Sequence, residues 1–533
     1  MPFSWPPGGR RPCACSEMDV TNFDPWLTTA GEPPSFGEVL GAYGSGPHAD
    51  DPAVIYPDGT LTWRELDERS TRRARDLVAR GVKPDDLVGL ALPNLAVFHE
   101  IAFAVWKAGA TPCILSPRLP EQELAEIVSV AAPRVLFAQS SHTLDGVQQI
   151  DPYAPVEDHD AVLPRAVAQW KAVTSGGSTG RPKIIVDRQP ARFGTLLKGM
   201  VEQLRMSPGG VIVNPGPLSH NAAFLFTSLA LLSRCRVVGL ARFDAEETLR
   251  LIDRHHADWI CLVPTMMHRI WSLPDAVKSR YDLSSLRAVW HVASACAPWL
   301  KRAWIDWLGA DRIWELYAGT ESFGAAISGE EWLNKPGSVG RVAPGSLEIL
   351  DANHQPVGAG EIGEIHFPPV AASGFAYLGA DMKADERGRF SLGDLGHIDE
   401  DGYLFLADRR TDLIIRGGAN IYPAQVEAAL DEHPAIASAV VIGLPSEEFG
   451  QTVHAILEIH PGEGLDLAGV DAFVRARLAG YKAPESYERA SSPLRDDAGK
   501  VRRSALVQQR AEWLRDGRVF RESPAIPRTR PSR

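Results

Sequence analysis

The segment from Thr174 to Lys183 (TSGGSTGRPK) carries residue types that could bind a polyphosphate. Its glycines let backbone N–H groups crowd around an anion, and its hydroxyl side chains add further donors. Lys183 places a positive charge at the end of the segment. We expect the phosphate-binding residues to be Thr174, Ser175, Gly176, Gly177, Ser178, Thr179, Gly180 and Lys183.

Three other interpretations of this segment fit less well. A Walker loop ends in Gly-Lys-[Ser/Thr], but here Arg-Pro separates the glycine from Lys183 and Ile184 replaces the hydroxyl. Gly176–Gly180 matches the G-x-S-x-G of a hydrolase, yet that elbow leads into a helix, whereas this chain continues into a β-rich run. A flexible linker is hard to reconcile with strong strand patterns on both sides.

Strand and helix patterns alternate on both sides of this segment and predict the domain that positions it. Their order indicates right-handed crossovers in a parallel sheet. We expect Asn221–Leu232 to be a buried helix, and we expect strands at Leu87–Leu92, Thr111–Leu115, Arg134–Ala138, Val211–Asn214, Trp259–Val263, Leu286–Val292 and Arg312–Leu316. The expected fold is α/β: a large N-terminal domain of parallel and mixed sheets with helices, a small β-barrel-like subdomain after Leu347, and a small α+β C-terminal domain beyond Asp412.

Length and composition exclude several classes of protein. The 533 residues are 44% hydrophobic and 23% charged, which is ordinary for a globular chain of two or more domains. A net charge of −12 gives no general attraction to nucleic acid. The longest apolar run, Ala222–Leu232, is too short to span a bilayer, and the six cysteines include no C-x-x-C pair. The first residues lack an apolar secretory segment, so we expect a cytoplasmic protein.

Ser175–Lys183 resembles the phosphate loop of the adenylate-forming superfamily, [ST]-[SG]-G-[ST]-T-G-x-P-K. This superfamily contains acyl-CoA synthetases, adenylation domains of peptide synthetases, and luciferases. Further motifs in the family's order extend the resemblance from about Ala53 to Arg503. Gly176 stands where many members have Ser, and Ile184 where Gly is usual. The resemblance implies an acid–CoA ligase that uses ATP, Mg²⁺ and coenzyme A.

Two further motifs resemble the family's nucleotide and metal site. Tyr317-Ala-Gly-Thr-Glu321 is similar to Y-G-x-T-E, in which the ring packs on adenine. By that resemblance Thr320 would touch the α-phosphate and Glu321 would hold Mg²⁺. Asp394 and Arg409 match the family's ribose-binding pair. Without the other motifs, the Gly-Asp-x-Gly around Asp394 would be interpreted as a turn.

The C-terminal motifs resemble the family's hinge and catalytic lysine. Asp408–Asp412 (DRRTD) is similar to the hinge, with Thr411 where Asp or Lys is usual, and Gly417 and Gly418 match the turn that lines the pantetheine tunnel. Lys500 (in DAGKVRR) matches the lysine that bridges carboxylate and phosphate. The domains implied are a disordered extension over 1–35, an AMP-binding domain over 36–408, a hinge over 409–412, a mobile domain over 413–515, and a disordered basic tail over 516–533.

The acyl pocket is the part of the site that the sequence describes least. His220 (in PLSH) resembles the residue that borders this pocket in the family, and a histidine before an apolar helix is equally a helix cap or a core residue. The resemblance puts Ala295 among the cofactor-site residues, where many members have Gly-Gly-Ala. The added bulk at Ala295 and Cys296 would reshape the pocket. The segment His291–Trp299, together with Trp290, is more similar to bile-acid and related bulky-acid CoA ligases, which suggests a fatty, steroid-like or aromatic acid.

The implied reaction is attack of a carboxylate on the α-phosphorus of ATP, followed by transfer of the acyl group to the CoA thiol. No general base is needed, because a carboxylate with a pKa of about 4 is already ionised. Lys500, Lys183 and Mg²⁺ on Glu321 would neutralise the developing charge. The partners expected are a small carboxylic acid, ATP and CoA, without nucleic acid or a membrane span, and with a homodimer left open. Two alternatives remain: transfer to an amine, carrier protein or other nucleophile, and a binding protein without catalysis.

Overall fold

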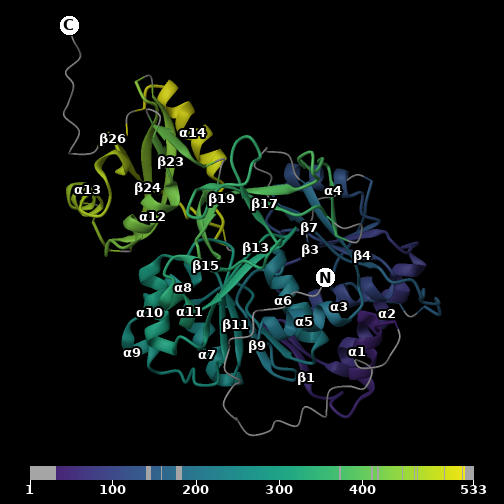
Figure 1. Ribbon diagram of the computed structural model, residues 1–533. Coiled ribbons are helices and arrows are strands. Elements are labelled where there is room, and N and C mark those ends of the chain that lie inside the picture. Colours follow the sequence, from purple (N-terminus) through teal and green to yellow (C-terminus); the bar gives the residue numbers. More distant parts are fainter. Residues whose placement is uncertain are drawn as a thin grey trace.

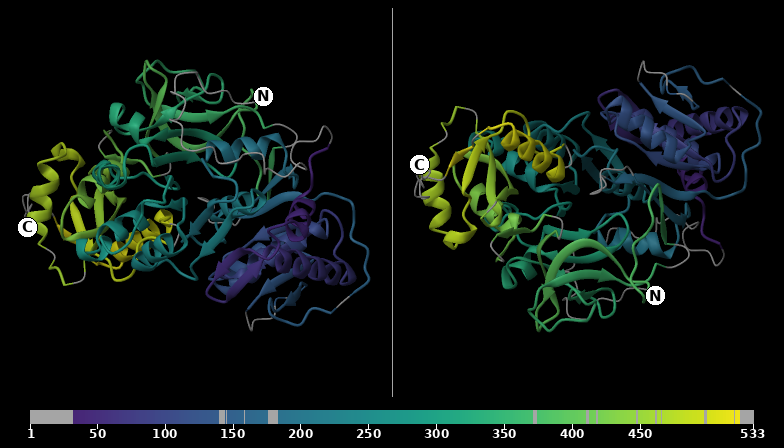
Figure 2. Two further views of the ribbon diagram at one scale, coloured as in Figure 1. Left: turned by 90° about the horizontal axis from the view of Figure 1, so that it is seen from below. Right: turned by 90° about the horizontal axis from the view of Figure 1, so that it is seen from above.

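A computed structural model describes residues 32–522, apart from 140–143, 145, 158, 176–182, 371–373, 410–411, 417–418, 447, 461, 465, 497–498 and 519. Figure 1 shows a large N-terminal part, coloured purple to green, and a smaller C-terminal part in yellow-green and yellow. In both views of Figure 2 the yellow part and the purple part lie at opposite ends of the molecule. The α/β class with a large and a small domain is therefore confirmed.

The larger of the two main sheets has eight strands in the order β14-β13-β12-β11-β9-β10-β1-β2. Its central strands are parallel, and each edge strand is antiparallel to its neighbour. The strands are short and apolar because helices cover both faces of a parallel sheet. Their bounds are β1 Pro52–Tyr56, β2 Gly59–Thr62, β9 Val211–Asn214, β10 Arg236–Gly239, β11 Trp259–Leu262, β12 Ala288–His291, β13 Ile313–Ala318 and β14 Phe323–Ser328.

The second main sheet has seven strands in the order β18-β8-β7-β4-β3-β5-β6. Strands β7 and β8 flank the predicted phosphate segment as an antiparallel pair in which Ser175 opposes Lys183. The strands predicted on both sides of this segment are therefore confirmed. The bounds are β3 Leu87–Ala91, β4 Thr111–Ile114, β5 Val135–Ala138, β6 Gln148–Ile150, β7 Gln169–Ser175, β8 Lys183–Pro190 and β18 Phe375–Leu378.

One hydrophobic core joins these two sheets. Side chains from both sheets contribute to it, together with α1, α2, α3 and the apolar helix α6, which has the predicted bounds Asn221–Leu232. The helices of the large domain are α1 Phe36–Ser45, α2 Trp63–Ala79, α3 Ala96–Lys107, α4 Glu121–Ala131, α5 Thr195–Gln203, α6, α7 Ala245–His255, α8 Pro264–Trp271, α9 Asp275–Lys278, α10 Pro298–Leu308 and α11 Gly329–Asn334.

The predicted sheet or barrel after Leu347 is an antiparallel sheet of five strands in the order β15-β20-β19-β17-β16. Its edge strands β15 and β16 are not paired with each other among the described residues, so this sheet is open rather than a closed barrel. It has a small core of its own around Ile365 and Phe367. The bounds are β15 Ser338–Arg341, β16 Glu348–Leu350, β17 Gly363–Phe367, β19 Phe390–Ile398 and β20 Tyr403–Arg409.

The C-terminal part has its own cores, which begin at Ile414 and include Phe520. Phe520 is buried against His454 and Trp513, and β26 adds to the edge of the four-stranded sheet β23-β24-β25-β26. The small domain therefore continues to residue 522, beyond the boundary predicted at 515. The bounds are β21 Ile414–Arg416, β22 Ala419–Ile421, α12 Pro423–Asp431, β23 Ile436–Ser446, β24 Gly450–Ile459, α13 Leu467–Arg475, β25 Ser486–Arg489, α14 Arg503–Arg515 and β26 Arg521–Glu522.

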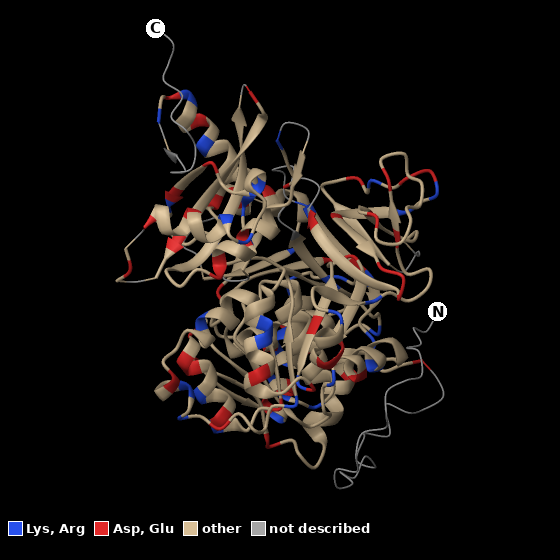
Figure 3. Cartoon of the chain, turned by 60° about the vertical axis from the view of Figure 1, so that its left-hand side comes forward, with Lys and Arg blue, Asp and Glu red and all other residues tan. Residues whose placement is uncertain are grey.

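Two properties of the whole molecule bear on its partners. Within the described ranges, none of the helices has the length and apolar character needed to cross a membrane. Lys and Arg are interspersed with Asp and Glu over both domains in the view of Figure 3. This mixed pattern agrees with the prediction that phosphate binding depends on a local site.

Candidate active site

Lys183 and Glu321 meet where the two main sheets approach each other. Lys183 is the first residue of β8 in one sheet, and Glu321 lies in the turn between β13 and β14 of the other. The Lys183 Nζ and Glu321 Oε1 atoms are 3.5 Å apart, although 138 positions separate the two residues in the chain. The predicted phosphate-binding cation and the predicted metal-binding carboxylate therefore share one place.

Tyr377 on β18 completes this cluster. β18 pairs with β8, and the Tyr377 hydroxyl donates a hydrogen bond of 2.8 Å to Glu321 Oε1. The Lys183 Nζ lies 4.2 Å from the centre of the Tyr377 ring. Burial, and then the charge of Glu321, raise the pKa of Tyr377 well above its ordinary value. The phenol therefore stays protonated and acts as a hydrogen-bond donor.

Tyr317 and Asp394, the predicted adenine and ribose residues, are in direct contact. The Tyr317 hydroxyl at the end of β13 donates a hydrogen bond of 2.8 Å to Asp394 Oδ2 on β19. Asp394 is directly opposite Arg409 in the antiparallel pair of β19 and β20. A Cβ added at Gly324 would lie 2.4 Å from Tyr317 Cδ1, so only glycine lets β14 pass this ring. Tyr317, Asp394 and the backbone of Arg409 thus form one group.

Glycine is also required between Tyr317 and Glu321. A Cβ added at Gly319 would lie 2.5 Å from Leu392 Cδ1 and 3.3 Å from Glu321 Oε2. Thr320 follows this glycine and is partly exposed. The close approach of the turn to β19 therefore fixes the distance between the nucleotide group and the Lys183–Glu321 pair.

The other predicted residues of the large domain lie at the carboxyl edge of the parallel strands. His220 follows β9, Ala295 follows β12 and Tyr317 ends β13, and in open α/β sheets ligands bind at this edge. The backbone of His220 caps α6 but its side chain does not, so the side-chain cap considered for it is absent. Ala293, just after β12, has a φ of +77°, a left-handed conformation that is rare for a residue with a Cβ and often found at functional sites.

The segment that carries Lys500 is docked at the same edge. Lys500 follows a tight turn in which its N–H donates to Asp496 Oδ1 over 2.9 Å. Gly499 has a φ of +75°, and a Cβ there would lie 3.2 Å from Thr265 Oγ1 and 3.3 Å from Val263 Cγ2. Because Val263 and Thr265 come directly after β11, the turn faces the strand ends that carry the other site residues.

The arrangement agrees with comparisons to known proteins. The family described as AMP-binding enzyme matches residues 45–368, and the AMP-binding enzyme C-terminal domain matches residues 425–496. The chain belongs to the AMP-binding enzyme family. The predicted resemblance to adenylate-forming enzymes is therefore confirmed.

Relatives of this AMP-binding enzyme act on different acids and acceptors. A fatty acid–[acyl-carrier-protein] ligase, ScoC of Streptomyces coeruleorubidus, is 28% identical over 85% of this chain and 92% of its own length. A feruloyl-CoA synthase of an Amycolatopsis species is 30% identical over 85% of this chain and 94% of its own length. The solved O-succinylbenzoate CoA synthetase of Bacillus subtilis with ATP and magnesium ion has a TM-score of 0.75 and 25% identity, covering 89% of this chain and 100% of its own.

The residues of this AMP-binding enzyme fit a nucleotide-bound Mg²⁺. Mg²⁺ prefers oxygen ligands, usually one or two carboxylates together with substrate phosphates. Glu321 offers such a carboxylate beside Thr320, and both of its hydrogen-bonding contacts named above use Oε1. Glu321 would hold the metal ion, with Lys183 close enough to share the phosphates.

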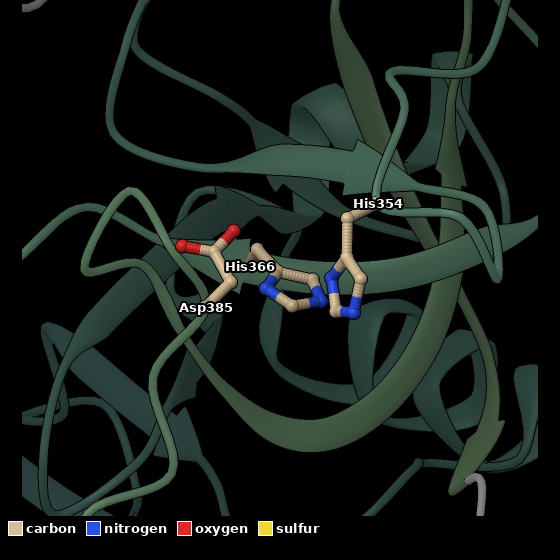
Figure 4. Close-up of side chains that lie close together, drawn as sticks. All are labelled: His354, His366 and Asp385. Carbon is tan, nitrogen blue, oxygen red and sulfur yellow. The ribbon is translucent and has the colours of Figure 1, made fainter.

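A second group of potential metal ligands lies on the five-stranded sheet and is shown in Figure 4. His354, His366 and Asp385 each offer a ligand atom, and these atoms lie within 4.8 Å of one another. However, Arg389 Nε donates to Asp385 Oδ2 over 2.7 Å, and two further backbone N–H groups donate to Oδ1. The guanidinium thus already supplies the positive charge at this carboxylate, so Asp385 is engaged by an arginine rather than by a metal ion.

Some predicted site residues lie outside the described residues. These are Gly176, Gly177, Ser178, Thr179 and Gly180 of the phosphate segment, and Thr411, Gly417 and Gly418 near the hinge. Ser175 and Arg409 are placed by their backbones alone, and Thr174 is partly exposed on β7. The predicted roles of all these residues stay predictions.

Tyr377 and a buried ionic cluster were missed by the sequence analysis. Tyr377 belongs to no motif, and only the long-range pairing of β18 with β8 brings it to Glu321. The buried cluster consists of Lys301 on α10, Glu315 on β13 and His291 on β12. A signal was present for the cluster, because Glu315 and His291 interrupt otherwise apolar strands.

Proposed function

We propose that this chain activates a carboxylic acid with ATP, forming acyl-AMP and pyrophosphate, and then transfers the acyl group to coenzyme A. The observation that supports this most strongly is the meeting of the Lys183–Glu321 pair with the Tyr317–Asp394 pair at one sheet edge, facing the Lys500 turn. A cation, a carboxylate, an aromatic ring and a ribose-type acceptor are the groups that one ATP molecule needs.

In the first step the carboxylate of the substrate attacks the α-phosphorus and pyrophosphate leaves. Both reacting groups are anionic, so positive charge near the phosphates lowers the barrier. Lys183 supplies such charge from β8, and Lys500 supplies it from the small domain. Mg²⁺, when bound at Glu321, would neutralise charge on the phosphates. Tyr317 packs on the base and Asp394 accepts hydrogen bonds from the ribose hydroxyls.

In the second step the thiol of CoA attacks the acyl carbonyl and AMP leaves. The Gly417–Gly418 turn would line the path of the thiol after rotation about residues 409–412. A rotation of this kind requires the Lys500 turn to leave the end of β11. In this structure Gly499 lies against Thr265 and Val263, and Arg502 pairs with Glu123 of α4, so the rotation would break these contacts.

The substrate we propose is a bulky hydrophobic acid of fatty, steroid-like or aromatic type. Ala295 and Cys296 follow β12 at the edge where His220 also lies, and their side chains would shape the end of the acyl pocket. Two of the relatives named above are a fatty acid ligase and a feruloyl-CoA synthase, which supports a fatty or aromatic substrate. We propose a cytoplasmic location for the reaction, where ATP and CoA are available.

A non-CoA acceptor is the second candidate. One relative is a ligase that uses an acyl-carrier protein, so transfer to a carrier protein is an established outcome for a chain of similar length. In that case the first step and its residues would be unchanged, and only the surface that receives the thiol would differ.

A product assay separates these possibilities. The protein is incubated with ATP, Mg²⁺ and a panel of hydrophobic acids, with and without CoA, and AMP and thioesters are measured by mass spectrometry. We expect AMP and an acyl-CoA with at least one acid. AMP and acyl-AMP without any thioester would favour another acceptor, and no AMP with any acid would overturn the proposal.

A further inference from the structure

Tyr377 touches both charged residues of the candidate ATP site, although it lies far from them in the chain. Its hydroxyl contacts Glu321 and its ring lies beneath the ammonium group of Lys183. Tyr377 reaches this place because β18 pairs with β8 so that it opposes Ile185, two positions after Lys183. One side chain thereby connects an edge strand of the second sheet to the turn after β13.

The hydroxyl of Tyr377 restrains Glu321 without occupying both of its oxygens. The hydrogen bond of 2.8 Å goes to Oε1, which is also the oxygen nearest to Lys183. The other oxygen, Oε2, lies toward Gly319, where an added Cβ would come within 3.3 Å of it. A carboxylate held by one oxygen in this way presents the second oxygen in a defined direction.

The ring of Tyr377 restrains Lys183 without neutralising it. The Nζ of Lys183 lies 4.2 Å from the ring centre, within the range of a cation–π contact. Its distance of 3.5 Å from Glu321 Oε1 is longer than that of a typical charge-assisted hydrogen bond. The ammonium is therefore positioned by the ring and can exchange its carboxylate partner for a phosphate.

We propose that Tyr377 is a positioning residue that prepares Glu321 for Mg²⁺ and Lys183 for phosphate. When Mg·ATP binds, Lys183 turns from Glu321 to the phosphates, while the Tyr377 hydroxyl keeps Glu321 Oε1 and directs Oε2 to the metal ion. This inference rests on the proposed function, because it assigns Tyr377 a part in the same ATP site. It separates two tasks on one side chain: the hydroxyl acts on metal binding, and the ring acts on the lysine.

Two substitutions separate the two tasks. Tyr377→Phe removes the hydroxyl and keeps the ring, whereas Tyr377→Leu removes both. Tyr153→Phe is the matched control, because the Tyr153 hydroxyl also donates to a carboxylate, Asp58, at an exposed place outside the site. Melting temperatures of all three variants check that the fold is retained.

Binding of ATP is measured by calorimetry without acid or CoA, first in EDTA and then across a Mg²⁺ titration. For Tyr377→Phe we expect ATP affinity in EDTA within about twofold of wild type, and a half-saturating Mg²⁺ concentration about tenfold higher, as for one lost hydrogen bond to a charged group. For Tyr377→Leu we expect the same change with Mg²⁺ and, in addition, weaker ATP binding in EDTA. Tyr153→Phe should match wild type in both.

The results also distinguish this inference from the proposed function. If wild type binds Mg·ATP and Tyr377→Phe needs no more Mg²⁺ than wild type does, the inference is wrong and the proposed function stands. A Tyr377→Phe variant that loses ATP affinity equally with and without Mg²⁺ would also contradict the separation of tasks. Absence of any ATP binding by wild type would overturn both.

Discussion

β13 and the turn that follows it each carry a glutamate paired with a lysine, and the two pairs are built differently. On β13, Glu315 Oε2 lies 2.6 Å from the Nζ of Lys301, whose side chain is 1% exposed. In the turn, Glu321 Oε1 lies 3.5 Å from the Nζ of Lys183, whose side chain is 27% exposed. Both carboxylate side chains are largely buried, at 11% exposed for Glu315 and 8% for Glu321, so the pairs differ in their separation and in the exposure of the lysine. We call Lys301–Glu315 the buried pair and Lys183–Glu321 the open pair.

The difference shows how environment assigns a role to an ion pair. Removing both charges of the Lys301–Glu315 pair from water is costly, so each charge depends on its partner. In the Lys183–Glu321 pair the lysine stays in contact with water, and Tyr377 contacts both partners, so the lysine can exchange its carboxylate for a ligand. We infer that the buried pair ties α10 to β13 and that the open pair binds substrate.

The largest expected effect is on stability, from breaking the buried pair. Lys301→Met leaves Glu315 as an unpaired buried carboxylate and should lower the free energy of unfolding by about 3–5 kcal/mol, measured by denaturant titration. The double variant with Glu315→Leu removes both charges and should regain most of this loss. Equal stability of the single and double variants would contradict the role given to this pair.

The next largest effect is on activity, from neutralising the open pair. Glu321→Gln removes the metal-binding charge and should slow adenylate formation by about 10²–10³-fold, as for the loss of one preorganised electrostatic group. Its free energy of unfolding should stay within about 1 kcal/mol of wild type, because glutamine keeps an oxygen that can accept the Tyr377 hydrogen bond and the partly exposed Lys183 remains hydrated. Stopped-flow measurement of pyrophosphate release, with unfolding curves beside it, checks both statements. If Glu321→Gln kept its activity but lost stability, the open pair would have the structural role that we assign to the buried pair.

His291, which lies beside the buried pair, makes the stability of the protein depend on pH. Burial, and then the opposing charges of Glu315 and Lys301, leave the pKa of His291 at about 4, and its Nε2 is 3.7 Å from Glu315 Oε2. The unfolded histidine, with a pKa near 6.5, takes up a proton as the pH falls below that value, whereas the folded one does so only near pH 4. The free energy of unfolding should therefore decrease as the pH is lowered from about 6.5 to about 4.

The variant His291→Gln isolates this contribution. Between about pH 6.5 and about pH 4, the free energy of unfolding of this variant should change less steeply with pH than that of wild type. The difference in slope should be up to about 1.4 kcal/mol per pH unit. If His291→Gln and wild type lose stability in parallel, the histidine is not the titrating group.

The smallest expected effect concerns the approach of Lys500 to the open pair. Gly499→Ala adds a Cβ at a φ of +75° and against Thr265 and Val263, and should slow adenylate formation by about threefold to tenfold. Thioester formation from supplied acyl-adenylate should be unchanged if it uses the rotated domain. Gly517→Ala is the matched control, with a φ of +82° and no atom within 4 Å of the added Cβ. Equal slowing of both steps would show that docking of this turn is not specific to the first.

The sequence predicted the parts of this site that depend on local pattern. Strand patterns on both sides of Thr174–Lys183 predicted the β7–β8 pair, and the apolar run of α6 predicted its bounds. The order of the motifs placed Tyr317 and Asp394 in one predicted nucleotide site, and the two side chains are in contact in the structure. These features follow from the period of hydrophobic residues and from short spacings, which a sequence displays directly.

The parts that were missed depend on long-range packing. Tyr377 lies in a short strand whose position beside β8 no local pattern indicates. No local pattern marks Lys301, and only the packing of α10 on β13 buries it. The boundary expected at 515 followed the Arg and Pro residues near the end of the sequence, and no local pattern indicated that Phe520 packs on the small domain.

The most direct test of the central claim is exchange of labelled pyrophosphate into ATP with a broad panel of carboxylic acids. The central claim is that one ATP molecule binds between the open pair and the Tyr317–Asp394 pair. We therefore expect exchange that requires Mg²⁺ and at least one hydrophobic acid. This exchange should be nearly lost in Glu321→Gln. Lys301→Met combined with Glu315→Leu should retain it. Absence of exchange with every acid, or exchange that survives Glu321→Gln undiminished, would contradict the account.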